Sequence, residues 1–156
     1  MSAKGERFTL DTDILVYSID SAAGWKHDLA AEIVDRAAER DCLLTLQATS
    51  EFFVAATRKR LMPLVEAAAQ AADWLEIFPT IASSPDAVRT ALAHAAERRA
   101  SYWDALMIAT ASEAGCALIL TEDLQDGARL RSVGIHNPFA RSGRLTGEAR
   151  QLLGLD

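Results

Sequence analysis

The chain has 156 residues, of which 50% are hydrophobic and 24% are charged, and it carries a formal net charge of −6 at pH 7. This length fits one domain with a buried core, and so much apolar sequence excludes intrinsic disorder. No apolar run reaches the ~20 residues of a membrane span and the first residues are too polar for a signal peptide, so we expect a cytoplasmic protein without membrane contact. The negative charge argues against a broadly basic nucleic-acid-binding surface, although it does not exclude nucleic acid.

The cysteines and histidines do not have the spacing of a structural metal site. Cys42 and Cys116 each stand at the head of an apolar, strand-like run, which predicts buried thiols and no disulfide. The three histidines are scattered, and no pair of cysteines has the spacing of zinc ligands. Zinc is therefore not expected.

Short apolar runs alternate along the chain with helix-like patterns. Strands are expected at residues 7–11, 43–47 and 117–121, with another near 133–137 and an edge strand over 77–83. Helices are expected over residues 13–20, 27–40, 50–60, 64–76, 86–98 and 102–114. This alternation predicts an α/β fold in which helices cover both faces of a mainly parallel sheet, with functional sites at the carboxyl ends of the strands.

Four carboxylates occupy positions that such a sheet would bring to one edge. Asp11 ends the first strand, Glu51 begins the helix after the second strand, and Asp123 follows the strand at 117–121. Asp104 lies in the first turn of the helix before that strand, and a helix packed antiparallel to the strand would start at the same edge. We therefore expect these four acids, from four segments, to converge.

Converging carboxylates need compensation. Two like charges ~4 Å apart repel by about 4 kcal/mol at an effective dielectric near 20. A divalent cation removes this conflict, and ligands that are all carboxylates suit Mg²⁺ or Mn²⁺. Helix N-termini expected at Glu51 and Asp104 would add positive ends. Such a site can activate water and stabilise the charge of a phosphoryl group during in-line displacement.

Each acid also has a structural interpretation. Asp104 stands three residues after Ser101 and fits a capping box, and Glu51 fits a first-turn acid. Asp123 fits a turn residue before Gly127. Asp11 is the hardest to explain in this way, because it follows an apolar strand without a cationic neighbour. The metal-site hypothesis therefore depends on the four acids together.

Four segments carry a family resemblance: LDTDILVY at 10–17, SEFF at 50–53, SYWDALMIATASEAGCALILTEDLQDG at 101–127 and IHNPF at 135–139. In these segments the chain resembles the PIN-domain proteins, and specifically the VapC-type toxins of bacterial toxin–antitoxin pairs. The resemblance implies a three-layer α/β/α sandwich with a central, mainly parallel sheet. It also implies one domain over residues 1–156, with a core of about 6–139 and a C-terminal tail over 140–156.

The resemblance further implies an activity and partners. These are a Mg²⁺- or Mn²⁺-dependent endoribonuclease that cuts RNA, a small antitoxin protein that blocks the site, and a homodimer. The acidic positions of the family map onto Asp11, Glu51, Asp104 and Asp123. We predict that Asp11, Asp104 and Asp123 hold one or two ions, while Glu51 ligates a metal or orients the attacking water.

Three further residues of the site have supporting roles in this interpretation. Thr121 is expected to supply a supporting hydroxyl, and Asp126 to be an additional acid. Asp13 departs from the family, which more often has asparagine there. A metal role, a role in supporting the metal ligands and a role at the helix start therefore all stay open for Asp13.

Two other interpretations stay open. The DTD segment also resembles the opening motif of HAD-type phosphatases, with Asp11 as nucleophile and Asp13 as acid/base. Such enzymes need a lysine for the phosphoryl group, and Lys4, Lys26 and Lys59 are not expected near the site. The third interpretation is a non-catalytic module of the same fold that binds RNA or protein.

Arg98 and Arg99 are the better candidates for RNA contacts, because they precede Ser101 and so come near Asp104, and a solvated helix end is the equal alternative for them. The basic residues 58–60 close a helix, where they compensate its dipole, and we expect them to lie away from the acidic edge. Two aromatic side chains could stack on bases or lie in the core: Trp25 and Trp103.

Overall fold

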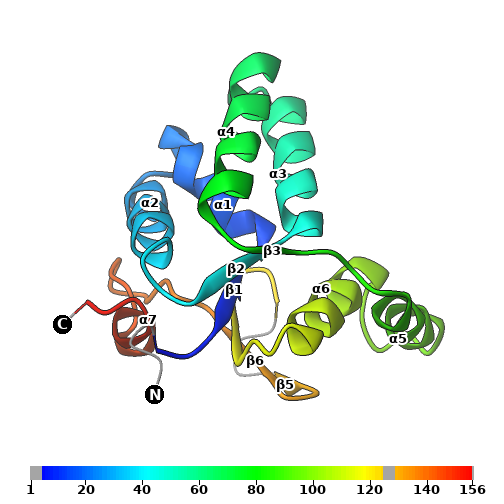
Figure 1. Ribbon diagram of the computed structural model, residues 1–156. Coiled ribbons are helices and arrows are strands. Elements are labelled where there is room, and N and C mark those ends of the chain that lie inside the picture. The colour runs from blue at the N-terminus through cyan, green and yellow to red at the C-terminus, as the bar shows by residue number, and fades with distance from the viewer. Residues whose placement is uncertain (1–4, 125–128, 156) are drawn as a thin grey trace.

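A six-stranded sheet in the order β3-β2-β1-β4-β6-β5 forms the centre of the computed structural model (Figure 1), which describes residues 5–124 and 129–155. The strands are β1 (Phe8–Leu10), β2 (Cys42–Thr45), β3 (Thr80–Ile81), β4 (Leu118–Leu120), β5 (Arg129–Leu130) and β6 (Val133–His136). Neighbouring strands are parallel, except that β5 and β6 are antiparallel. The mainly parallel sheet expected from the sequence is confirmed.

Helices cover the sheet and complete a three-layer α/β/α sandwich (Figure 1). The helices are α1 (Thr12–Ile19), the 3-10 turn η1 (Ser21–Ala23), α2 (Trp25–Ala37), α3 (Leu46–Arg58), α4 (Leu64–Ile77), α5 (Pro85–Ala96), α6 (Tyr102–Glu113) and α7 (Gly147–Leu152). All six expected helices occur, and α7, η1 and β5 were not expected. Within the described residues, no helix has the length and apolar character needed to cross a bilayer.

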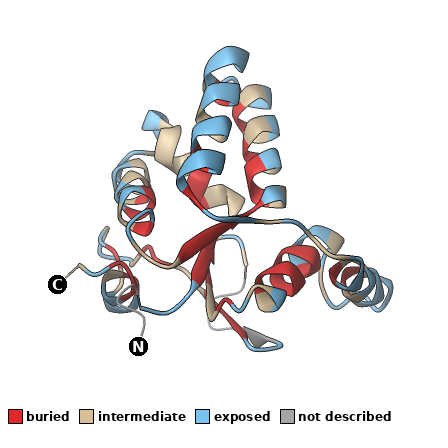
Figure 2. Ribbon diagram, viewed as in Figure 1, coloured by how far each residue is buried: buried red, intermediate tan, exposed pale blue. Residues whose placement is uncertain are grey.

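The central strands are buried on both faces (Figure 2), so they appear in the sequence as continuous apolar runs and not as alternating ones. Helix α6 is buried over seven consecutive residues, Ala105–Ala111, because it packs against both the sheet and α5. The α5–α6 contact is built mainly from alanines, which let the two backbones approach closely: Ala87, Ala91, Ala105 and Ala109. Both cysteines are buried free thiols, as expected.

The segment after residue 139, expected as a tail, contributes to the core. Leu145, Ala149, Leu152 and Leu153 are buried in the same cluster as the central strands. Helix α7 is only six residues long and has a weak sequence pattern, which is why the apolar positions around it did not indicate a packed element.

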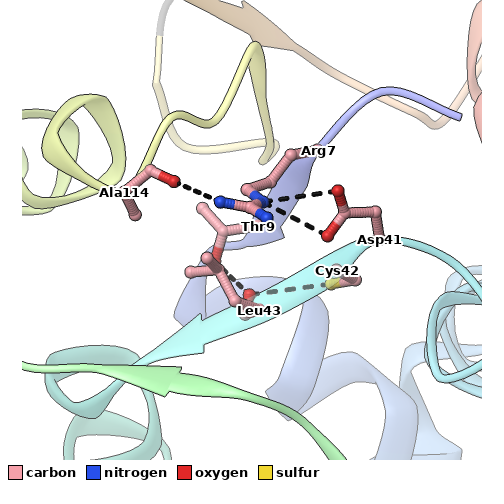
Figure 3. Close-up of polar contacts among 6 residues, drawn as sticks. All are labelled: Arg7, Thr9, Asp41, Cys42, Leu43 and Ala114. Atoms are coloured by element: carbon pink, nitrogen blue, oxygen red, sulfur yellow. Dashed lines mark hydrogen bonds and ion pairs between the residues drawn. The ribbon is translucent and has the colours of Figure 1, made fainter. Parts of the chain in front are cut away.

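The amino ends of the strands are joined by Arg7 (Figure 3). Its Nε donates to Asp41 Oδ1 and Oδ2 at 3.2 and 3.3 Å, and its Nη1 donates to the carbonyl of Ala114 at 2.8 Å. These contacts connect the starts of β1 and β2 with the end of α6. Because Arg7 is about half exposed, we assign its ion pair a modest stabilisation, of roughly 1 kcal/mol or less.

Phe52 offers a test of the core on which α3 rests. Its ring is fully buried and lies 4.6 Å from the ring of Trp74 on α4, centroid to centroid. Phe52→Ala should lower the free energy of unfolding by about 3–5 kcal/mol, since it removes a buried ring and leaves a cavity. Val54→Ala, on the exposed side of the same helix, is the control and should change it by less than ~1 kcal/mol in urea titrations. Equal effects of the two substitutions would contradict this packing.

Candidate active site

An open cleft of about 1000 Å³ lies where β1 and β4 end, between α1, α3 and α6. Five carboxylates line it: Asp11, Asp13, Glu51, Asp104 and Asp123. The structure therefore brings together the four acids that the sequence analysis selected, although they come from four separate segments. Their catalytic roles stay predictions.

The sheet register places Asp11 beside the residues that follow β4. Leu10 pairs with Leu120, and the Asp11 amide donates to the Leu120 carbonyl at 3.0 Å. Asp11 Oδ2 then accepts a hydrogen bond from Thr121 Oγ1 at 2.7 Å. The same hydroxyl oxygen accepts from the Asp123 amide at 3.1 Å. One fully buried hydroxyl group thus connects two of the candidate metal ligands.

Asp13 uses both carboxylate oxygens to hold backbone amides. Its Oδ1 accepts from the Ile14 amide at 2.9 Å, and its Oδ2 accepts from the Glu122 amide at 2.7 Å. The second bond fastens the loop after β4 to the first turn of α1. These contacts give Asp13 a structural role, at the start of α1 and in holding this loop, and its metal role stays a prediction.

The expected position of Glu51 in the first helical turn is wrong. Helix α3 begins at Leu46, directly after β2, and Thr45 caps it by accepting a hydrogen bond from the Ala48 amide at 3.0 Å. Glu51 therefore lies in the second turn, where the positive helix end has little effect. The segment LLTLQ, residues 43–47, has the composition of a strand throughout, but the chain changes from strand to helix within it, between Thr45 and Leu46. The sequence pattern gave no sign of this change.

Two hydrogen bonds fix the Glu51 carboxylate. Thr12 Oγ1 donates to its Oε2 at 2.9 Å, and Gln47 Nε2 donates to its Oε1 at 3.0 Å. Gln47 Nε2 also donates to the carbonyl of Trp103, at the start of α6, at 3.0 Å. Gln47 was not identified from the sequence, although it stands one helical turn before Glu51 and so shares its face.

Asp104 lies where it was expected, in the first turn of α6. Ser101 caps the helix, and its Oγ accepts from the Asp104 amide at 3.1 Å. Helix capping therefore involves the backbone amide of Asp104. The Asp104 side chain takes no part in it, and it is exposed and lines the cleft. The predicted additional acid, Asp126, lies outside the described residues.

Burial and mutual repulsion both act on the acids of the cleft. Burial raises the pKa of Asp11 above its usual value, against the hydrogen bonds from Thr121 and Thr12, and the charges of Asp123 and Asp104 raise it further. Burial also raises the pKa of Asp13 to about 8, with a further contribution from the charge of Asp11.

Desolvation raises the pKa of Asp123 as well, and the charges of Glu122 and Asp104 add to the shift. Two cations, Lys59 and Lys26, oppose it. The cleft therefore holds more negative charge than its own cations neutralise, which is the situation that a bound divalent cation relieves.

The donor chemistry fits a hard cation, because every candidate ligand is a carboxylate and none is histidine or cysteine. Over residues 5–124 and 129–155, no three acidic, histidine or cysteine side chains form a group that could hold one ion. The structure thus supplies the donors around a common cleft without a preformed coordination shell.

The basic side chains of the cleft differ from those expected. Arg58 and Lys59 line it, although we expected them to lie away from the acids. Arg98 and Arg99 are not among the residues that line it, and Arg99 pairs with Glu97 at 2.6 Å. Helical periodicity alone indicates only that Arg58 shares a face of α3 with Glu51.

Arg58 stands seven residues after Glu51, and seven residues are close to two turns, so the two side chains share one face of α3. Their separation along the axis is only ~10 Å, at ~1.5 Å per residue. The cleft extends this far along α3, so the end of the helix does not lie away from the site.

The chain is thus an α/β protein with a carboxylate-lined cleft at the carboxyl ends of its parallel strands. The PIN domain family matches residues 8–129, and the chain belongs to this family. Family membership argues against the phosphatase interpretation, even though Lys59 does line the cleft. No curated protein matches the sequence significantly.

Two solved structures are similar in fold. One is the Mycobacterium tuberculosis toxin VapC20, which cleaves the sarcin–ricin loop, with a TM-score of 0.60 and 16% identity over 74% of this chain and 89% of that one. The other is VapBC2 from Rickettsia felis bound to a promoter DNA fragment, with a TM-score of 0.61 and 13% identity over 84% of this chain and 98% of that one. At these identities the likeness describes the fold.

The bridging hydroxyl of Thr121 can be tested by Thr121→Val, which keeps the shape and removes the hydrogen bonds. The free energy of unfolding should fall by about 1–3 kcal/mol, because the buried partners lose a hydrogen bond without gaining water. Thr121→Ser keeps the hydroxyl and is the matched control, expected to lose less. Urea titration of both variants measures the difference, and a valine variant as stable as the serine variant would contradict the bridge.

Proposed function

We propose that this protein is a metal-dependent endoribonuclease that hydrolyses phosphodiester bonds of RNA, and that it is the toxin of a toxin–antitoxin pair. The observation that carries the proposal is the cleft where Asp11, Glu51, Asp104 and Asp123 meet from four separate segments. Membership of the PIN domain family and the fold likeness to VapC20 support it.

Asp11, Asp104 and Asp123 are the proposed ligands of Mg²⁺ or Mn²⁺. When bound, such an ion would supply positive charge that neutralises these carboxylates and stabilises the phosphoryl group during in-line displacement. The protein contributes the placement of the donors. Thr121 orients the Asp11 carboxylate and the Asp123 backbone, so that both face the cleft at the end of the sheet.

Glu51 is the proposed residue that orients the attacking water. Thr12 and Gln47 each donate one hydrogen bond to it, which holds the carboxylate in place and leaves further lone pairs on both oxygens. A carboxylate oxygen held in this way can accept a hydrogen bond from a water molecule in the cleft.

Arg58 and Lys59 are the proposed phosphate contacts, and they replace Arg98 and Arg99 in this role. They line the same cleft as the acids, so a strand bound at the carboxylates can reach them. Trp103 also lines the cleft, and its side chain is 59% exposed, which suits stacking on an unpaired base.

We further propose a small antitoxin protein as partner, a homodimer as the assembly, and the cytoplasm as the location. The fold likeness to VapBC2, a complex seen on promoter DNA, supports the antitoxin. The homodimer follows from the resemblance alone.

The direct test is cleavage of total cellular RNA with Mg²⁺ or Mn²⁺, followed by mapping of the cut ends. Asp11→Asn and Asp104→Asn should each lower the cleavage rate at least ~100-fold, since each replaces a proposed carboxylate ligand of the metal by a neutral amide. Asp86→Asn, at the first turn of α5 outside the cleft, is the matched control and should cut like the unmodified protein. Circular dichroism checks that each variant is folded.

Addition of a chelator should abolish cleavage, and excess Mg²⁺ or Mn²⁺ should restore it. Equal cleavage by the unmodified protein and both site variants would remove the assignment. RNA binding without any cutting under these conditions would favour the non-catalytic module instead.

The phosphate-binding role of Arg58 and Lys59 has its own test. Arg58→Ala with Lys59→Ala should weaken binding of a single-stranded RNA in the presence of chelator. It should also flatten the dependence of log affinity on log salt by roughly 0.7 for each phosphate that the variant no longer neutralises. The double variant Arg98→Ala with Arg99→Ala removes the same charge elsewhere and should change the slope less. Fluorescence anisotropy at several salt concentrations measures the slope for both double variants. A larger change for the Arg98 and Arg99 variant would contradict this assignment and favour Arg98 and Arg99 as the phosphate contacts.

The toxin proposal predicts growth arrest when the protein is expressed in bacteria. Asp11→Asn should abolish the arrest because cleavage is lost, and co-expression of the proposed antitoxin, expected as a small protein encoded next to this one, should relieve the arrest by the unmodified protein. Growth curves with matched expression levels measure both effects. If the cells keep growing while the expressed protein cleaves RNA, the toxin proposal is wrong and the nuclease proposal is not affected.

A further inference from the structure

Lys26, in the first turn of α2, has three aromatic neighbours. Its Nζ lies 5.6 Å from the ring centre of Tyr17, 5.7 Å from that of Trp25 and 5.9 Å from that of Phe139. Phe139 packs edge-on against both of the other rings. Three separate segments therefore form an aromatic enclosure for one ammonium group, each ring within the range of a cation–π contact.

The same ammonium pairs with the Glu122 carboxylate. Glu122 Oε1 also accepts a hydrogen bond from Tyr17 Oη at 2.6 Å, so the lysine and the tyrosine hold both of its oxygens. The side chains of Lys26 and Glu122 are only 30% and 22% exposed. This burial distinguishes the pair from ordinary surface ion pairs, which contribute little.

The backbone of Glu122 leads directly into the cleft. Its amide donates to Asp13 Oδ2 at 2.7 Å, and the next residue, Asp123, lines the cleft. Lys26 and Tyr17 therefore hold the side chain of the same residue whose backbone amide is held by Asp13.

We propose that Lys26, held by the rings of Tyr17, Trp25 and Phe139, is a positioning residue of the active site. It fastens Glu122 and thereby fixes the backbone that places Asp123 at the cleft and donates a hydrogen bond to Asp13. The lysine is not among the residues that line the cleft, so in this proposal it acts through Glu122 and not by contact with substrate. The role in catalysis rests on the proposed nuclease function, whereas the fastening of the loop does not.

Alternative roles for Lys26 make different predictions. A substrate contact would affect the KM for RNA, because binding of phosphate would be weakened. A purely structural contact would affect the stability of the whole domain. A positioning residue should affect kcat and the local order of residues 121–123, because the placement of Asp123 changes.

The first experiment uses the metal-free protein and follows amide hydrogen exchange. The amides of Glu122 and Asp123 are hydrogen-bonded to Asp13 and Thr121, so they report directly on the loop. In Lys26→Met, which keeps the length of the side chain and removes its charge, these amides should exchange several-fold faster, while those of the central strands stay unchanged. Arg89→Met removes an exposed cation paired with Asp86 and is the matched control.

The second experiment measures RNA cleavage at saturating metal. Lys26→Met should lower kcat by about 10- to 100-fold with the KM unchanged, as expected for a residue that orients a metal ligand. Glu122→Gln should have a similar effect. The double variant should be no slower than the worse single variant, because both changes break one pair.

The outcomes separate the alternatives. Unchanged exchange at Glu122 and Asp123, or faster exchange across the whole sheet, would overturn the proposal. A raised KM with unchanged kcat, or independent, multiplying losses in the double variant, would also overturn it. If the unmodified protein does not cut RNA, the nuclease proposal fails, and the exchange measurement alone decides whether Lys26 fastens the loop.

Discussion

The parallel pairing of β1 with β4 is the constraint on which the site depends. Its register sets Leu10 opposite Leu120, so both strands end at the same level and the chain leaves them side by side. The residues that follow are thereby brought within hydrogen-bonding distance, and the Thr121 hydroxyl meets Asp11. A slip of the register would separate these groups and turn buried strand residues toward other neighbours. Core packing and the geometry of the cleft are therefore set by the same strand pairing.

Much of this could be predicted from the sequence, because the relevant information is local. The strands around Leu10 and Leu120 are apolar runs, and Ser101 three residues before Asp104 is a strong start signal for a helix. Once parallel strands are inferred, topology alone sends their carboxyl ends to one edge. The meeting of Asp11, Glu51, Asp104 and Asp123 needs no knowledge of side-chain packing, which is why it could be anticipated.

Other features depend on tertiary contacts that no local pattern encodes. The start of α3 at Leu46 was missed because the same residues suit the end of a strand, and the packing of the helix decides between them. The position of Arg58 depended on the extent of the cleft along α3, which only the assembled structure gives. The enclosure of Lys26 joins residues as distant in sequence as Tyr17 and Phe139, and no spacing rule relates them.

The uneven distribution of charge in the cleft has a consequence for the order of events. Carboxylates gather where the strands end, and Arg58 and Lys59 lie farther along α3. A polyanion is attracted to the cations whether or not the acids are neutralised, but it is repelled from the carboxylates until a cation compensates them. In the proposed reaction, capture of a strand and commitment to cutting it are thus separable steps, and the supply of divalent metal controls only the second. Under that proposal, RNA is retained in the cleft before the metal binds and cleavage begins.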